Sequence, residues 1–251
     1  MSGQTLWIIG GSSGIGLSLV ALYLKKGHRV IASAPNTQNS KALNDLKSEY
    51  HSSLHLVDMD VSQMQSVKEA TQRAWSIYGG VDVALYNAGI YEKMGVDALS
   101  FKSVSAICEV NYLGAVRFLT QIVPLFKKQG RGHIAFNVSI SSYFGLPFGG
   151  AYSAPKAALL NFCESINPEL MRENIHLQVI NHGFVKTRLT QKNDFKMPQL
   201  IEPDEAAQKI YEGLQRPQKF EIKFPWLLTR LIGVLRILPY ALAFKITKKA
   251  L

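Results

Sequence analysis

The 251-residue sequence predicts one α/β domain, a doubly wound parallel β-sheet with helices on both faces, followed by a C-terminal amphipathic helical tail. Short apolar runs, each as long as a buried strand, alternate with longer segments whose apolar residues follow helical spacing. This alternation is typical of right-handed βαβ units, in which the connecting helices cover a parallel sheet. Neither an internal repeat nor a low-complexity linker divides the chain, and its length fits a single domain of this class.

The first half of the chain is expected to hold four strands and four helices in alternation. Glycine readily takes the left-handed conformation that ends a helix, and Gly27, Gly79 and Gly130 stand at three such points. Strands are predicted at residues 6–9, 29–34, 54–59 and 81–86, and helices at residues 15–25, 40–50, 61–78 and 101–128.

The second half continues this alternation towards the basic tail. Three more strands are predicted at residues 133–138, 175–181 and 220–224, and two helices at residues 151–173 and 205–214. In an open parallel sheet, ligands bind outside the carboxyl ends of the strands. Functional residues are therefore expected where these strands end or in the helix that follows each of them.

The composition excludes several classes of protein. Apolar residues make up 47% of the chain and charged residues 18%, which excludes intrinsic disorder, a collagen and a small disulfide scaffold. Cys108 and Cys163 are far apart, and the six histidines lack metal-ligand spacing, so no metal site is expected. The start of the chain, residues 1–5, is short and polar and unlike a signal peptide, which favours a reducing, cytoplasmic compartment.

A glycine-rich turn follows the first predicted strand, with the sequence Gly10-Gly11-Ser12-Ser13-Gly14-Ile15-Gly16. Glycines allow a tight turn and a close approach of the backbone to a pyrophosphate, and the next helix offers free N–H groups at the positive end of its dipole. A simple left-handed turn without a ligand is the alternative. The position of the turn between a strand and a helix favours a dinucleotide-binding loop.

The spacing Gly10-x-x-x-Gly14-x-Gly16 resembles the glycine motif of the classical short-chain dehydrogenase/reductase family, with Ile9 where that family usually has threonine. The resemblance covers about residues 6–214 and implies a Rossmann-like fold and an NAD(P)-dependent oxidoreductase. Such an enzyme interconverts a carbonyl and a secondary alcohol by hydride transfer. Further motifs of the family follow in order: Asp60-Val61, Asn87-Ala88-Gly89, Asn111, Ser139 and Tyr152-x-x-x-Lys156.

This resemblance also implies the roles of individual residues. The catalytic tetrad would be Asn111, Ser139, Tyr152 and Lys156, with Asn111 holding a water in a proton relay. Near the end of the sixth strand, His182 replaces the proline that usually precedes the glycine of this family. Implied cofactor contacts are Gly10, Ser12, Ser13, Gly14, Ile15, Gly16, Asp60, Val61, Asn87, Ala88, Gly89, Tyr152, Lys156, Gly183, Val185 and Thr187.

The chemistry of the Tyr152–Lys156 pair can also be argued from the residues themselves. Side chains four positions apart on a helix lie on the same face. A phenol has a pKa of about 10, and a neighbouring ammonium group is expected to lower the pKa of Tyr152. Tyr152 can then act as general acid or base while Ser139 hydrogen-bonds the same substrate oxygen. A buried tyrosine beside a lysine that reaches for solvent is the structural alternative.

The end of the second strand bears on the choice between NAD and NADP. NAD-binding proteins commonly place an acidic residue there for the ribose hydroxyls, but residues 31–37 contain none. NADP is therefore favoured, with NAD as the alternative. The groups expected to hydrogen-bond a 2′-phosphate are Ser12, Ser33, Asn36 and Thr37, with Lys41 nearby.

Aromatic residues cluster around the predicted catalytic positions. Tyr143, Phe144 and Phe148 lie between Ser139 and Tyr152 in the sequence, and Tyr91 and Phe184 follow two other strands. They predict a substrate pocket for a bulky apolar carbonyl or alcohol. Packing among loop aromatics or a subunit interface is the alternative, and a homo-oligomer, dimer or tetramer, is expected. The competing function is a catalytically weak cofactor-binding sensor or a membrane-associated scaffold.

The basic excess is concentrated in the C-terminal tail. The whole chain carries a net charge of +10, whereas residues 218–251 carry seven Lys and Arg against Glu221 alone, a net +6. We therefore divide the chain into a catalytic domain, residues 1–217, and a last strand with a basic apolar tail, residues 218–251. Arg230 and Arg236 interrupt the apolar run, which disfavours a membrane span.

Peripheral membrane contact through residues 224–249 is one expectation for this tail. Packing of the tail on the substrate pocket or in an oligomer interface is the other. Nucleic acid is not an expected partner, because the basic residues alternate with aliphatic ones and do not form a continuous basic stripe.

Overall fold

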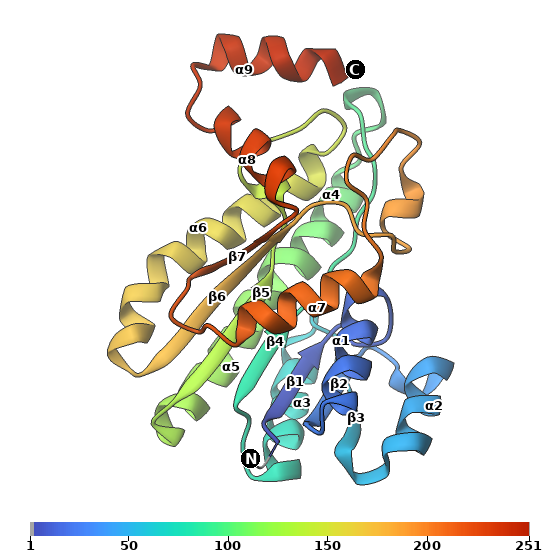
Figure 1. The fold of residues 1–251 in the computed structure, drawn as a ribbon, viewed down its shortest axis with the longest axis vertical. Coiled ribbons are helices and arrows are strands. Elements are labelled where there is room, and N and C mark those ends of the chain that lie inside the picture. The colour runs from blue at the N-terminus through green and yellow to red at the C-terminus, as the bar shows by residue number, and fades with distance from the viewer. Residues whose placement is uncertain (1–2, 251) are drawn as a thin grey trace.

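The structure, a computed structural model, describes residues 3–250 and contains one seven-stranded sheet (Figure 1). Met1 and Ser2, which begin the polar start, and Leu251, the end of the tail, lie outside the described residues. Every strand pairs in parallel with its neighbours, in the order β3-β2-β1-β4-β5-β6-β7. The strands are β1 Thr5–Ile9, β2 Arg29–Ala34, β3 Leu54–Asp58, β4 Val83–Tyr86, β5 Gly132–Asn137, β6 Ile175–His182 and β7 Glu221–Phe224.

Helices cover both faces of this sheet, so the predicted doubly wound α/β fold is confirmed (Figure 1). Helices α3, α5 and α6 pack on one face, and α1, α2 and α7 pack on the other. The described helices are α1 Gly14–Lys25, α2 Lys41–Tyr50, α3 Met64–Tyr78, α4 Phe101–Cys108, α5 Gly114–Gln129, α6 Gly150–Arg172, α7 Pro203–Leu214, α8 Trp226–Leu235 and α9 Tyr240–Thr247.

The long helix predicted at residues 101–128 is interrupted in the structure. A π-helical turn, Glu109–Leu113, separates α4 from α5. Two side-chain contacts hold this turn: the Tyr86 hydroxyl donates to the Val110 carbonyl at 2.6 Å, and the Asn111 amide bonds the backbone of Ile90. The apolar periodicity runs through the turn, which is why the sequence does not reveal the interruption. The other predicted bounds differ from the observed ones by at most three residues.

Aromatic side chains join the centre of the sheet to α5. The ring of Trp7 on β1 meets Phe118 edge-on at a centroid distance of 5.3 Å, and Phe118 also contacts Tyr86 of β4 at 5.9 Å. The Trp7 indole donates a hydrogen bond to the Ser33 hydroxyl at 2.9 Å, which satisfies its polar atom in the core. β1 leads into the glycine-rich turn and β4 leads into Asn87-Ala88-Gly89. This packing therefore holds the starts of both segments in place.

The C-terminal tail continues directly from β7. Helices α8 and α9 extend past the carboxyl end of the sheet, with Pro239 between them (Figure 1). None of the helices within residues 3–250 is both long and apolar enough to cross a bilayer.

Replacing Phe118 by alanine tests this core. The ring is fully buried between Trp7 and Tyr86, so Phe118→Ala should lower the free energy of unfolding by about 3–5 kcal/mol. Phe101→Ala is the matched control, because Phe101 is 86% exposed and its removal should change the free energy by less than about 0.5 kcal/mol. Denaturant unfolding measures both, and equal losses would contradict the described packing.

Candidate active site

A cavity of about 410 Å³ opens at the carboxyl ends of the central strands. Its wall combines the glycine-rich turn, the ends of β3 to β6, the start of α6, the loop after β6 and one side of α8. It includes most residues that the sequence analysis singled out: Gly10, Ser12, Ser13, Gly14, Ile15, Asp60, Val61, Asn87, Ala88, Gly89, Tyr91, Ser139, Phe148, Tyr152, Lys156, Gly183, Phe184, Val185 and Thr187.

The glycine-rich turn leaves the start of α1 open to this cavity. Gly10 has a φ of +83°, and a Cβ there would lie 2.7 Å from the Ala88 nitrogen. Ser13 is the N-cap of α1, yet its side chain does not bond the first turn of the helix. Free N–H groups at a helix start attract anions, so the turn fits the pyrophosphate of a dinucleotide. Gly16 lies behind the cavity, where a Cβ would lie 2.1 Å from the Gly10 carbonyl oxygen.

Arg188 adds a positive charge that the sequence analysis did not assign to the site. Its Nη2 donates to the Ser13 hydroxyl at 2.9 Å, and both residues line the cavity. Arg188 lies 175 positions away in sequence, on the loop after β6. Only the folding of that loop over the glycine-rich turn brings this guanidinium to the start of α1. No motif in the sequence signals this contact.

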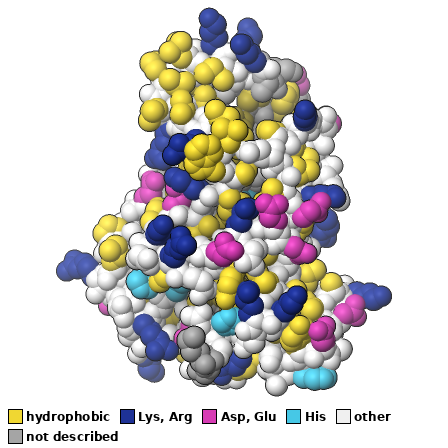
Figure 2. Space-filling view, viewed as in Figure 1, with side chains coloured by type: hydrophobic (Ala, Val, Ile, Leu, Met, Phe, Trp, Pro, Cys, Tyr) yellow, Lys and Arg dark blue, Asp and Glu magenta, His cyan; other side chains and the backbone are white. Residues whose placement is uncertain are grey.

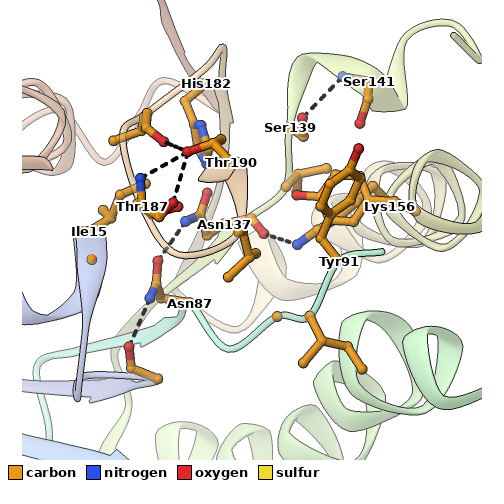
Figure 3. Close-up of a pocket in the computed structure, with 18 of the residues that line it drawn as sticks. Ile15, Asn87, Tyr91, Asn137, Ser139, Ser141, Lys156, His182, Thr187 and Thr190 are labelled. Atoms are coloured by element: carbon orange, nitrogen blue, oxygen red, sulfur yellow. Dashed lines mark hydrogen bonds between the residues drawn. The ribbon is translucent and has the colours of Figure 1, made fainter. Parts of the chain in front are cut away.

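Ser139, Tyr152 and Lys156 all line the cavity. Figure 3 shows Ser139 and Lys156 on the same side of it. Ser139 follows β5, whereas Tyr152 and Lys156 lie one turn apart on α6. The Lys156 amine donates to the Asn137 carbonyl at 2.7 Å and lies 5.7 Å from the centre of the Tyr152 ring. The ring of Tyr91 stands edge-on to Tyr152 at 5.3 Å. The arrangement presents a hydroxyl, a phenol and an amine to the same space.

Burial dominates the acid–base properties of this wall. It lowers the pKa of Lys156 to about 7, because the ammonium form loses hydration. It raises the pKa of Tyr152 to about 12, and the hydrogen bond with Ser139 opposes the rise only in part. The expected lowering of the Tyr152 pKa by Lys156 is therefore wrong for the protein without cofactor, since desolvation outweighs the effect of the neighbouring amine.

A chain of amide hydrogen bonds links the cofactor loop to Lys156 (Figure 3). The Asn87 amide donates to the Gly10 carbonyl at 2.9 Å, and the Asn137 amide donates to the Asn87 oxygen at 2.6 Å. The Asn137 carbonyl then accepts from Lys156. Asn137 was not singled out in the sequence, because an asparagine at the end of a strand carries no motif of its own.

Asn111 lies beside the cavity wall and is fully buried. Its Oδ1 accepts from the Ile90 nitrogen at 2.8 Å, and its Nδ2 donates to the Ile90 carbonyl at 2.9 Å. These bonds hold the segment that follows Asn87-Ala88-Gly89. The predicted role of Asn111 in a water relay stays a prediction.

Three of the polar residues that were expected near a 2′-phosphate form hydrogen bonds with other groups of the protein. Ser33 is buried and accepts from the Trp7 indole, so its hydroxyl points away from the cavity. Asn36 accepts from the Asn39 nitrogen at 3.2 Å and lies outside the cavity lining. The Thr37 hydroxyl donates to Asp58 at 2.6 Å. Side chains alternate between the two faces along β2, and Ser33 lies on the face that carries Trp7 and is covered by α3, α5 and α6.

The aromatic residues predicted for the substrate pocket fall into two groups. Tyr91, Phe148 and Phe184 line the cavity, whereas Tyr143 and Phe144 do not. The Tyr143 hydroxyl bonds Glu221 of β7, and the Phe144 ring lies 6.1 Å from Phe244 of α9. A short helical turn after Ser139 directs these two rings towards the tail. Apolar lining that the sequence analysis missed comes from Leu146, Phe195, Leu228 and Ile232.

His182, which stands in the sequence where the resemblance implies a proline, is the last residue of β6 and borders the cavity. Its Nδ1 donates to the Gly183 carbonyl at 2.7 Å. Burial lowers the pKa of His182 to about 4, so its ring is neutral at pH 7.

Lys156 should leave a signature in the pH dependence of stability. Its pKa is about 7 in the folded protein against an ordinary value of 10.5, so the unfolded state binds more protons between these values. The free energy of unfolding of the wild type, relative to Lys156→Met, should therefore rise from pH 7 to pH 10, by at most about 1.4 kcal/mol per pH unit. Below pH 7 the difference should level off. Urea unfolding at several pH values measures it, and a flat difference would contradict the burial of this amine.

Comparison with known proteins agrees with this geometry. The family model of the short chain dehydrogenases matches residues 4–197. An uncharacterized oxidoreductase of Myxococcus xanthus is 31% identical over 239 residues, which are 95% of this chain and 94% of that protein. The human 17-beta-hydroxysteroid dehydrogenase type 1 is 33% identical over 207 residues, which cover 76% of this chain and 60% of that enzyme.

Solved structures show the same fold. A short chain dehydrogenase from Burkholderia cenocepacia in complex with NADP has a TM-score of 0.84 at 21% identity, over 98% of both chains. An alcohol dehydrogenase from Thermococcus sibiricus, complexed with 5-hydroxy-NADP, has a TM-score of 0.78 at 25% identity, over 88% of this chain and 95% of that one. The family match over most of the chain confirms the expected resemblance: the protein belongs to the short-chain dehydrogenase/reductase family of oxidoreductases.

Proposed function

We propose that the protein interconverts a bulky apolar carbonyl compound and its secondary alcohol, with NADP(H) as the hydride carrier and Tyr152 as general acid and base. The convergence of Ser139, Tyr152 and Lys156 on one cavity with the open start of α1 is the observation that carries this proposal. The cavity offers a phosphate-binding end and a proton-donating wall within one enclosure.

A nicotinamide cofactor bound in this cavity supplies or accepts the hydride. The protein's own part is to orient the substrate and to move one proton. Because the pKa of Tyr152 is raised, its phenol is protonated at neutral pH and can donate to a carbonyl oxygen. Ser139 hydrogen-bonds the same oxygen, and in alcohol oxidation Tyr152 accepts the proton. The buried Lys156 amine, held by Asn137, neighbours this phenol.

Replacing Tyr152 by phenylalanine separates binding from chemistry. Tyr152→Phe removes only the hydroxyl, so NADPH binding should persist while turnover falls about 10²- to 10⁴-fold. NADPH fluorescence measures binding, and NADPH consumption on a panel of carbonyl compounds measures turnover. Tyr50→Phe, on α2 outside the cavity, is the control and should keep full turnover. Retained turnover in Tyr152→Phe would exclude this residue as the proton donor. If the wild-type protein bound NADPH but turned over no carbonyl compound, the alternative function as a cofactor-binding sensor would be favoured.

NADP is proposed over NAD on the charges around the adenosine end of the cavity. β2 ends at Ala34, followed by Pro35, and both line the cavity without an acidic neighbour in the segment up to Thr37. Arg188 and the serines of the turn support binding of the pyrophosphate oxygens, which both dinucleotides carry. The NADP analogue bound to the Thermococcus sibiricus enzyme points the same way.

Removing the Arg188 guanidinium tests the proposed phosphate contact, and the wild-type titrations test the preference for NADP. Arg188→Ala should raise the dissociation constant of NADPH about 10- to 100-fold, the usual worth of a charge-assisted hydrogen bond to phosphate. Lys186→Ala is the matched control, because Lys186 lies on the same loop but pairs with Glu202 at 2.9 Å. Titrations with NADPH and NADH compare the two cofactors in each variant. Equal wild-type affinity for both would overturn the preference for NADP, and an unchanged affinity in Arg188→Ala would exclude a phosphate contact by Arg188.

The apolar substrate is proposed from the walls opposite the cofactor turn. Phe148, Phe184, Phe195, Leu228 and Ile232 present mainly carbon to this part of the cavity. Such a lining favours a large hydrophobic ligand with few polar groups over a sugar. The human relative is named for a hydroxysteroid, which is an apolar secondary alcohol, and this supports the same substrate class.

The protein's surroundings are part of the same proposal. A reducing, cytoplasmic compartment is supported by two free cysteines, of which Cys163 is buried. A homo-oligomer, dimer or tetramer, is supported by exposed apolar side chains such as Val96 and Leu99 in the segment before α4. Peripheral membrane contact through residues 224–249 is supported by the exposed apolar residues of α8 and α9.

A further inference from the structure

We propose that α8 and α9 bind an anionic lipid surface and that α8 is also the wall through which the active site receives a substrate dissolved in the bilayer. The substrate part of this proposal rests on the proposed function. The lipid contact rests on the tail alone, so the two can be tested apart.

A large apolar surface is exposed on the tail. Among the described residues, nine of the nineteen exposed large apolar side chains lie between positions 226 and 246, although this segment is a small part of the chain. Ile237 is 81% exposed and Tyr240 is 73% exposed. Figure 2 shows hydrophobic side chains gathered at the tail end of the molecule. We call this the tail surface: Trp226, Leu227, Leu231, Val234, Ile237, Tyr240, Leu242, Phe244 and Ile246.

α8 exposes apolar residues on one side although it also buries Leu228 and Leu235 on another. Thr229 is buried too, and Arg236 lies 3.8 Å from Glu164 of α6. Arg230, Gly233 and Arg236 line a groove against α6 and β7. A helix in water normally turns its apolar stripe to the core and its polar residues outward. The outward apolar side of α8 therefore needs an apolar partner.

The charge of the tail selects the kind of partner. Residues 225–249 contain five cations and no acidic residue. Contact with a second copy of the same tail would bring these cations together, which is unfavourable. An anionic lipid surface complements them and also offers an apolar layer for the tail surface. Arg230 lies 4.5 Å over the Trp226 ring, which keeps a cation beside an aromatic side chain suited to the interface.

The lengths of the two helices determine how they meet a bilayer. α8 has ten residues and α9 has eight, whereas a span needs about 20. Both can lie in the plane of the interface, with the apolar side chains towards the acyl chains and Lys245, Lys248 and Lys249 near the headgroups. The tail then holds the catalytic domain at the surface without crossing it.

The opposite side of α8 belongs to the active site. Leu228 and Ile232 line the cavity, whereas Leu227 and Leu231, their neighbours in sequence, belong to the tail surface. The Leu228 nitrogen donates to Gln199 at 2.9 Å, which ties the start of α8 to the loop that carries Phe195. One helix thus separates the proposed lipid contact from the apolar substrate wall. A lipid-soluble carbonyl compound or secondary alcohol would cross this boundary without passing through bulk water.

Vesicle binding tests the lipid contact without using catalysis. The full-length protein is mixed with vesicles of phosphatidylcholine alone or with phosphatidylglycerol, and bound protein is separated by flotation. We expect binding to the anionic vesicles, weaker binding at high salt, and a blue shift of tryptophan emission that disappears in Trp226→Phe. Trp7 is buried, so Trp226 is the tryptophan on the tail that can enter the lipid.

Leu231→Glu and Ile237→Glu are the decisive variants. Each replaces an exposed side chain of the tail surface, so folding and NADPH affinity should persist while vesicle partitioning falls about tenfold or more. Met171→Glu is the matched control, because Met171 is 65% exposed at the far end of α6. The lipid contact would be overturned if both tail variants bound vesicles as strongly as the wild type. It would also be overturned if the wild-type protein did not bind anionic vesicles. A concentration-dependent dimer lost in both variants would assign the tail surface to a second copy instead.

Kinetics test the route of the substrate. With anionic vesicles present, the rate on a carbonyl compound that partitions into lipid should fall several-fold in Leu231→Glu. The rate on a small water-soluble carbonyl compound should not change in that variant. If Leu231→Glu had the wild-type rate on both compounds, the substrate route would be overturned while the lipid contact stayed intact. No turnover on any carbonyl compound, with vesicle binding preserved, would instead reject the proposed function.

Discussion

A line of backbone and amide hydrogen bonds from Gly10 to Lys156 connects the two halves of the site. Asn87 holds the cofactor turn, Asn137 holds Asn87, and the Asn137 carbonyl holds the lysine amine. Each link joins the carboxyl ends of different strands of the sheet, so the parallel register of β1, β4 and β5 sets the distances. The positions of the glycine-rich turn and of the wall that carries Lys156 therefore depend on the same few bonds.

Burial then gives these groups their chemistry. The same loss of hydration lowers the pKa of Lys156 and raises the pKa of Tyr152, because it disfavours a cation in one case and an anion in the other. The protein without cofactor thus favours a neutral phenol, the form that donates a proton to a carbonyl. Positive charge brought by an oxidised nicotinamide would favour proton acceptance, which suits the reverse reaction.

The tail connects the site to the exterior of the protein. α8 carries cavity-lining residues on one side and exposed apolar residues on the other, so its position affects both surfaces. Arg236 faces Glu164 of α6, beside a groove that Glu221 of β7 also lines.

Strand and helix order, the cofactor turn and the spacing of Tyr152 and Lys156 follow from the sequence, since local periodicity and short spacings encode them. Most of the residues that the sequence singled out also line the cavity. Long-range packing decided the rest: it directed Ser33 to Trp7, turned Tyr143 towards Glu221 and brought Arg188 to Ser13. It also set the pKa values, because desolvation depends on every neighbour in space, whereas a sequence pattern contains only the neighbours along the chain.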